Sequence, residues 1–185
     1  MKSHRLLFVV HKHDATQLHF DFRLQIGTVM PSWAIPKGPT MDPTMKRLAM
    51  PTSDHSMEYR NFEGVITEGK YGAGPVMIWD EGYYIPQIEE KKGELTNIED
   101  FDHAQKVMQA GLDAGQLKFE LFGKKLKGSF ALVKTKGFGP KDSWLMIKHR
   151  DDHVIEGFDA KTDDVSVVSS KTMDQIREEN NIYTS

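Results

Sequence analysis

The chain has 185 residues, 38% of them hydrophobic and 10% aromatic, which is enough to build a core and excludes general disorder. It has no cysteine, which excludes disulfides, thiolate nucleophiles and Cys-ligated metal sites. A polar amino terminus and the absence of a long apolar run argue against a signal peptide and a membrane span. We therefore expect a soluble, cytoplasmic protein of one domain, with or without short extensions.

The net charge of −3 conceals an uneven distribution of charge along the chain. Residues 116–150 contain 9 Lys+Arg against 2 Asp+Glu, whereas residues 151–185 contain 3 against 9. A basic stripe can bind a phosphate backbone, although a solvated lysine-rich hairpin gives the same pattern. We predict a β-barrel domain over residues 1–150, followed by an acidic extension over 151–185 that packs loosely on the barrel or trails from it.

The first 80 residues are typical of short β-strands separated by glycine- and proline-rich turns. The clearest strand alternates, with His19, Asp21 and Arg23 on one face and only apolar residues on the other. We expect strands, in chain order, at residues 6–10, 19–26, 32–35, 47–50, 62–66 and 76–79.

A helix is predicted next, with Asn97 as its cap, apolar residues at helical spacing over 101–112, and an end at Gly115. Strands follow at 116–122, 128–134 and 143–148, and a weaker helix at 172–179. Many short strands with one or two short helices predict a mainly β fold, a closed or nearly closed β-barrel.

Histidines cluster around the alternating strand. The strand period points His19, Asp21 and Arg23 in one direction, and a turn at 15–17 can fold His13 back beside them. Two imidazoles and a carboxylate suit a divalent transition metal such as Mn²⁺, Fe²⁺ or Zn²⁺, and an adjacent arginine suits a phosphate. The alternative is that these are ordinary polar residues on the wet face of a hairpin. His11 shares a face with His13, so either one can be the ligand.

Several ordered motifs together indicate a family, although each of them is common by itself. They are FVVHKHDATQLHFDFRL at 8–24, SWAIPKGP at 32–39, KRLA at 46–49, Asp54-His55, Tyr59, FEGVI at 62–66, EGKYGAG at 68–74, KFELFGKKLKGSFALVK at 118–134, WLMIK at 144–148 and VSVVSSKTM at 165–173. In this order they resemble the 3′-phosphoesterase module of the bacterial and archaeal end-joining DNA ligase D, in a free-standing form. The resemblance covers nearly the whole chain.

The resemblance implies a Mn²⁺-dependent β-barrel enzyme that heals the 3′ ends of DNA or DNA/RNA primer–templates, with Co²⁺ or Zn²⁺ as other possible metals. Such enzymes remove a 3′-terminal ribonucleoside and then the remaining 3′-phosphate, leaving a 3′-OH for a ligase and a polymerase, which we expect to be separate partner proteins of the end-joining system. The implied site residues are His13, His19 and Asp21 as metal ligands, Arg23, Arg47, His55 and Lys37 as phosphate contacts, and Tyr59 as a further catalytic residue.

The chain departs from the family pattern in a few places. The family usually carries glutamine where His11 stands and glutamate where Gln25 stands, and ligase-fused members often have an acidic residue in place of Ser53. Only seven residues precede Phe8, whereas ligase-fused members have a longer arm that contributes to ribonucleoside removal. We therefore expect the 3′-phosphatase activity and leave ribonucleoside removal open.

Two other classes of function remain possible at this stage. A cupin-type oxygenase also places two histidines and a carboxylate on a β-barrel, although the cupin histidine pattern is missing and the arginines fit it poorly. A non-catalytic module that binds DNA ends is the other class. Its backbone contacts would come from Lys124, Lys125, Lys127, Lys134, Lys136 and Lys141.

Overall fold

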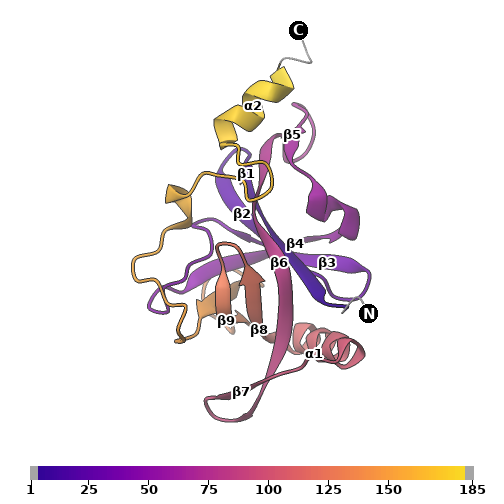
Figure 1. The fold of residues 1–185 in the computed structure, drawn as a ribbon, viewed down its shortest axis with the longest axis vertical. Helices are drawn as coiled ribbons and strands as arrows, with labels where there is room; N and C mark the ends of the chain where they lie inside the picture. Colours follow the sequence, from indigo (N-terminus) through magenta and orange to yellow (C-terminus); the bar gives the residue numbers. More distant parts are fainter. Residues whose placement is uncertain (1–3, 182–185) are drawn as a thin grey trace.

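The computed structural model describes residues 4–181 and consists mainly of β-strands, together with helices α1 (Phe101–Ala114) and α2 (Met173–Asn181) (Figure 1). The strands are β1 (Leu6–Asp14), β2 (Leu18–Leu24), β3 (Val29–Ile35), β4 (Arg47–Ser56), β5 (Gly64–Ile66), β6 (Gly74–Lys91), β7 (Glu94–Asn97), β8 (Gln116–Gly123), β9 (Lys127–Lys134) and β10 (Trp144–Lys148). Short 3-10 helices lie at η1 (Met57–Asn61) and η2 (Ala160–Thr162). Within residues 4–181, no helix is long and apolar enough to cross a membrane.

Antiparallel pairing closes the strands into a barrel. The order around it is β1-β2-β3-β4-β10-β9-β8-β6, and β6 pairs back onto β1. The long strand β6 runs along much of the long axis of the molecule, pairing with β5 near one end of the strand and with β7 near the other (Figure 1). The prediction of a closed or nearly closed β-barrel with one or two short helices is thereby confirmed.

The barrel core contains the apolar face of the alternating strand β2. Phe20, Phe22 and Leu24 are completely buried. Phe119 of β8 stacks on Phe22 with 5.8 Å between ring centroids, and Trp79 of β6 meets Phe20 edge-on at 5.4 Å. Because side chains alternate along a strand, this packing turns the polar residues of β2 to the opposite face, where the candidate site lies.

The predicted cap of the long helix was wrong. Asp100, not Asn97, is the N-cap of α1, and its side chain accepts a hydrogen bond from the backbone N–H of His103 at 2.8 Å. An N-cap must directly precede the first turn to reach such an N–H. Asn97 instead ends β7, a strand that was not predicted, and its side chain donates to Glu120 at 2.7 Å.

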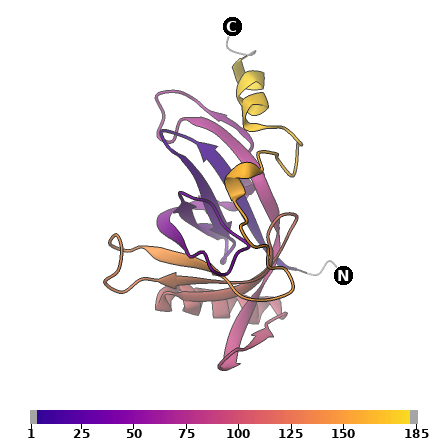
Figure 2. The ribbon, with the colours of Figure 1, turned by 90° about the vertical axis from the view of Figure 1, so that its left-hand side faces the viewer.

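The acidic segment after β10 lies against the barrel and follows it to α2 (Figure 2). Ala160, Met173 and Ile176 are buried in the same apolar cluster as the barrel residues, so the described part of this segment packs on the barrel rather than trailing from it. Residues 182–185 lie outside the described range. The boundary at residue 150 stays a prediction.

Lysines of the basic segment 116–150 form contacts with the acidic segment that follows residue 150. Lys125 Nζ lies 2.9 Å from an Asp163 carboxylate oxygen, and Lys124 Nζ donates to the Val167 carbonyl at 2.8 Å. Two of the six lysines considered for DNA-backbone binding are therefore used to hold the carboxyl-terminal segment.

The fully buried carboxylate of Asp80 organises the turn between β8 and β9. It accepts hydrogen bonds from the backbone N–H groups of Lys124, Lys125 and Leu126 at 2.9, 3.1 and 2.8 Å. We expect Asp80→Ala to lower the free energy of unfolding by about 3 kcal/mol, because three donors lose their acceptor. Urea titration followed by circular dichroism measures this change, with the exposed Asp152→Ala as control. A loss below about 1 kcal/mol would contradict this role.

Candidate active site

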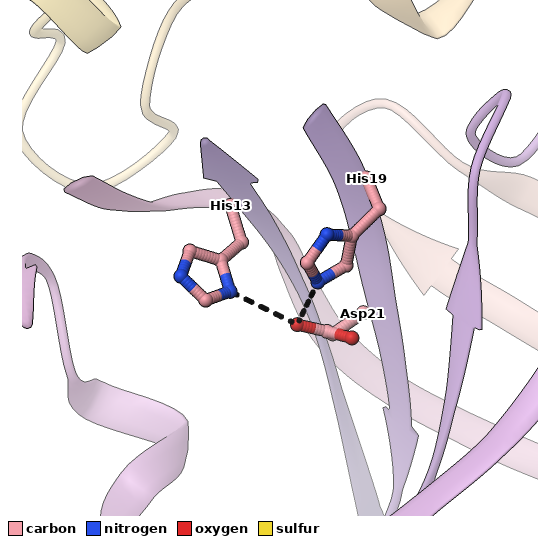
Figure 3. Close-up of side chains that lie close together, drawn as sticks. All are labelled: His13, His19 and Asp21. Atoms are coloured by element: carbon pink, nitrogen blue, oxygen red, sulfur yellow. Dashed lines mark hydrogen bonds and ion pairs between the residues drawn. The ribbon is translucent and has the colours of Figure 1, made fainter. Parts of the chain in front are cut away.

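The β1–β2 hairpin brings two histidines and an aspartate together. Its register pairs His13 with His19 across the two strands, and Asp21 is two residues further along the same face of β2. One potential ligand atom from each residue lies within 4.8 Å of the others. The shared atom is Asp21 Oδ2, which is 3.1 Å from His19 Nε2 and 3.8 Å from His13 Nδ1 (Figure 3).

The outer nitrogen of each imidazole faces a backbone carbonyl. His19 Nδ1 lies 3.0 Å from the Gln17 carbonyl, and His13 Nε2 lies 2.7 Å from the Gly72 carbonyl. A carbonyl only accepts, so each outer nitrogen carries the proton, and in the neutral ring the inner nitrogen presents a lone pair. Two lone pairs and a carboxylate then converge, an arrangement that a cation stabilises. Such carbonyl-oriented histidines are typical of metal ligands, so the donor set fits a divalent ion.

A glycine-rich turn supplies one of these carbonyls. Gly74 has φ of 132°, and a Cβ built there would lie 2.1 Å from the Asp14 carbonyl oxygen. Only glycine permits this close approach, which brings the preceding turn, with Gly72 also at positive φ, against His13. The segment 68–74 is thus a turn that positions a candidate ligand.

Arg23 lies beside Asp21 and is only 3% exposed. Its guanidinium uses Nη2 toward Asp21 Oδ2 at 3.3 Å, Nη1 toward His55 Nδ1 at 3.0 Å, and Nε toward His11 Nδ1 at 3.0 Å. An arginine has five N–H donors, so these contacts leave one on each terminal nitrogen. Arg23 therefore retains two N–H donors next to the candidate metal centre, the number that a bidentate contact to an anion uses.

The segment from η1 to β5 covers this polar face. The Tyr59 ring lies 5.1 Å from the Arg23 guanidinium carbon, 4.6 Å from the His55 ring and 5.2 Å from the His11 ring. Asp21 is consequently only 5% exposed. This burial shows that the alternative of an ordinary solvent-exposed hairpin face was wrong. Strand alternation predicts which residues share a face, but it does not predict that a later segment folds over that face.

Burial and charge set the ionisation of the cluster. Burial opposes ionisation of Asp21, but the neighbouring His13 and His19 imidazoles, together with the charge of Arg23, hold its pKa below the usual range. The hydrogen bond that the protonated form of His19 donates to Asp21 raises the pKa of His19. Burial, reinforced by Arg23, lowers the pKa of His55. At neutral pH Asp21 is therefore an anion and His55 is neutral.

His11 does not join the metal-ligand group. Burial, reinforced by the charge of Arg23, lowers its pKa from 6.5 to about 3. His11 binds a proton near pH 6.5 in the unfolded chain, but only near pH 3 in the folded chain. The stability that the folded chain has while His11 is neutral in both states is therefore present above pH 6.5 and is lost as the pH falls toward 3.

We expect His11→Gln to flatten the fall of the unfolding free energy between pH 6.5 and pH 3. Urea titrations across this range measure the slope, and the exposed His153→Gln serves as control. Parallel slopes for His11→Gln and the unmodified chain would contradict the assignment.

Arg47 and Lys37 are not brought into contact with this cluster. Asp21 pairs with Ala34 of β3, and Ala34 pairs with Met50 of β4, so Met50 lies on the same face of the sheet as Asp21. Side chains alternate along β4, so Arg47, three residues before Met50, lies on the opposite face. Its register partner on β10 is Met146. Its Nη2 contacts Met45 Sδ at 3.7 Å, and its buried Nε has no hydrogen-bond partner among residues 4–181. Lys37 is exposed in the turn after β3. Phosphate contacts by these two residues stay predictions.

Comparison with known proteins gives the family. A sequence model described as the DNA ligase D 3′-phosphoesterase domain matches residues 11–134. The chain belongs to this family. It is 38% identical over 171 residues to the multifunctional non-homologous end joining protein LigD of Pseudomonas aeruginosa, which covers 91% of this chain and 18% of that protein. It is 35% identical over 154 residues to the LigD DNA repair protein of Mycobacterium tuberculosis, which covers 82% of this chain and 17% of that protein.

The chain therefore spans less than a fifth of the length of these LigD relatives. The sequence did not predict the contacts that support the cluster of His13, His19, Asp21 and Arg23. The Gln17 and Gly72 carbonyls orient two histidines, and His11 contacts Arg23. Of these contacts, only the one made by the Gly72 carbonyl had a signal in the sequence, namely the glycines of 68–74. A backbone carbonyl that accepts a hydrogen bond does not require a particular side chain, so it leaves no sequence pattern.

Proposed function

We propose that the chain is a Mn²⁺-dependent 3′-end-healing phosphoesterase that removes a 3′-phosphate from primer–template ends and leaves a 3′-OH. Its substrates are the 3′ ends of DNA or DNA/RNA strands, and it acts in end joining together with a ligase and a polymerase. The observation that carries the proposal is the convergence of His13, His19 and Asp21 directly beside the guanidinium of Arg23. Membership of a phosphoesterase family supports the same reaction class.

The ion would be held by His13, His19 and Asp21, and Mn²⁺ supplies Lewis-acid polarisation of a phosphoryl oxygen when it is bound. Arg23 binds the other phosphoryl oxygens through its two remaining N–H groups and stabilises the charge that develops on them. Asp21 and His11 hold this guanidinium in place at two different nitrogens, Nη2 and Nε. The phosphoryl group is therefore oriented by contacts that exist before the substrate arrives.

His55 and Tyr59 complete the proposed site. His55 Nδ1 lies 3.0 Å from Arg23 Nη1 and 2.9 Å from the Ser53 carbonyl oxygen, and these two contacts hold the ring beside the guanidinium. The other ring nitrogen, Nε2, is assigned to the phosphoryl group or to the leaving oxygen. Tyr59 packs over Arg23 and His55 and keeps water from the guanidinium. Arg47 and Lys37 are proposed as additional contacts to substrate phosphate.

One assay tests this function. The protein and Mn²⁺ are incubated with a labelled primer–template that ends in one ribonucleotide, and with a second that ends in a 3′-phosphate. We expect the 3′-phosphate to be converted to 3′-OH only when Mn²⁺ is present. The ribonucleotide end shows whether the diesterase step occurs as well. Binding of the 3′-phosphate end without turnover would overturn the proposal and favour a non-catalytic end-binding module.

A further inference from the structure

His11 is completely buried at the centre of the polar face, yet it contacts no candidate metal ligand by hydrogen bond. We propose that His11 is a positioning residue that fixes the guanidinium of Arg23 for phosphate binding, and that an amide side chain of similar reach can replace it. The inference rests on the proposed function, because it assigns Arg23 to the substrate phosphate.

The two contacts of His11 determine its tautomer. Arg23 Nε donates to His11 Nδ1 at 3.0 Å, and a guanidinium N–H cannot accept, so Nδ1 presents a lone pair. His11 Nε2 lies 3.1 Å from the Phe62 carbonyl, which can only accept, so Nε2 carries the proton. His11 is thus a neutral ring that accepts on one side and donates on the other.

These contacts hold Arg23 from three directions. His11 extends from β1, Asp21 from β2 and His55 from β4, and each meets a different nitrogen of the planar guanidinium. Without the Nε contact, the guanidinium keeps only its two terminal contacts, and those terminal nitrogens are also the ones that must bind the phosphate. A buried Nε–H without an acceptor favours rotation of the group toward another partner.

His11 also ties Arg23 to the segment that covers it. The Phe62 carbonyl lies between η1 and β5, and Tyr59 of η1 packs on both His11 and Arg23. One imidazole therefore sets the distance between the hairpin and its cover. A glutamine has a carbonyl oxygen and an N–H₂ group at its end and can make both hydrogen bonds, whereas methionine has a similar length but offers neither.

The test compares His11→Gln and His11→Met, with the exposed His103→Ala as matched control. Three quantities are measured: kcat/KM on a 3′-phosphate primer–template, binding of inorganic phosphate to the Mn²⁺-loaded protein, and the Mn²⁺ dissociation constant. For His11→Met we expect kcat/KM and phosphate affinity to fall about 10- to 100-fold, with Mn²⁺ affinity unchanged. His11→Gln and His103→Ala should stay within about threefold of the unmodified chain.

Two outcomes would overturn the inference: a folded His11→Met variant that keeps its phosphate affinity, or a His11→Gln variant as impaired as His11→Met. If His11→Met does not fold, ¹⁵N NMR of the unmodified chain decides, since a proton on His11 Nδ1 contradicts the positioning contact. If the unmodified chain lacks phosphatase activity but phosphate binding shows the expected pattern, the proposed function fails and the role of His11 stands.

Discussion

Asp21→Asn is expected to reduce Mn²⁺-dependent phosphate release by about 1,000-fold, which corresponds to about 4 kcal/mol of transition-state stabilisation. The variant keeps the size of the side chain but removes the negative charge at which His13, His19 and Arg23 meet. Without that charge, two neutral imidazoles remain as the ligands of a divalent ion. Release of phosphate from a labelled 3′-phosphate primer–template measures the effect.

Two further measurements make the Asp21 result specific. Thermal melting shows whether the variant is folded, and the exposed Asp152→Asn controls for a general loss of negative charge. The Mn²⁺ dissociation constant should rise in Asp21→Asn and not in the control. A folded Asp21→Asn protein with normal phosphate release would exclude Asp21 as a ligand.

Arg23→Lys is expected to lower kcat/KM about 100-fold while leaving Mn²⁺ affinity within about threefold of the original. Lysine keeps the positive charge, but its single ammonium group cannot meet Asp21, His55 and His11 at three separate nitrogens and still bind a phosphate with two donors. Steady-state kinetics on the same primer–template, together with Mn²⁺ titration, separate the two effects.

The exposed Arg150→Lys is the matched control for this substitution and should be unchanged. If Arg23→Lys retained full kcat/KM, phosphate recognition would have to lie elsewhere. If Mn²⁺ affinity fell as far as kcat/KM, Arg23 would act through the ion and not on the phosphate.

The barrel could be predicted from the sequence because most strands alternate or are bounded by glycine and proline. Strand β6 was predicted only over 76–79, since Asp80 and Gly82 interrupt its apolar pattern. The structure shows why they are tolerated: Asp80 accepts three backbone N–H groups of the β8–β9 turn, and a Cβ at Gly82 would lie 2.0 Å from the Phe122 carbonyl oxygen. Both residues are explained by tertiary contacts with a segment that is distant in sequence. A local sequence pattern cannot predict such contacts.

The proximity of His13, His19 and Asp21 could also be predicted, because it depends only on strand alternation and a short hairpin turn. The burial of Arg23 and the separation of His11 from the ligand group could not. They depend on η1 and β5, which are far from the hairpin in sequence and fold over it.

The measurement that tests the account most directly is anomalous X-ray diffraction from crystals of the protein grown with Mn²⁺. The account predicts a single strong manganese peak bonded to His13 Nδ1, His19 Nε2 and an Asp21 carboxylate oxygen, with Arg23 at its side. A manganese peak bonded to other residues, or none at saturating Mn²⁺, would contradict it.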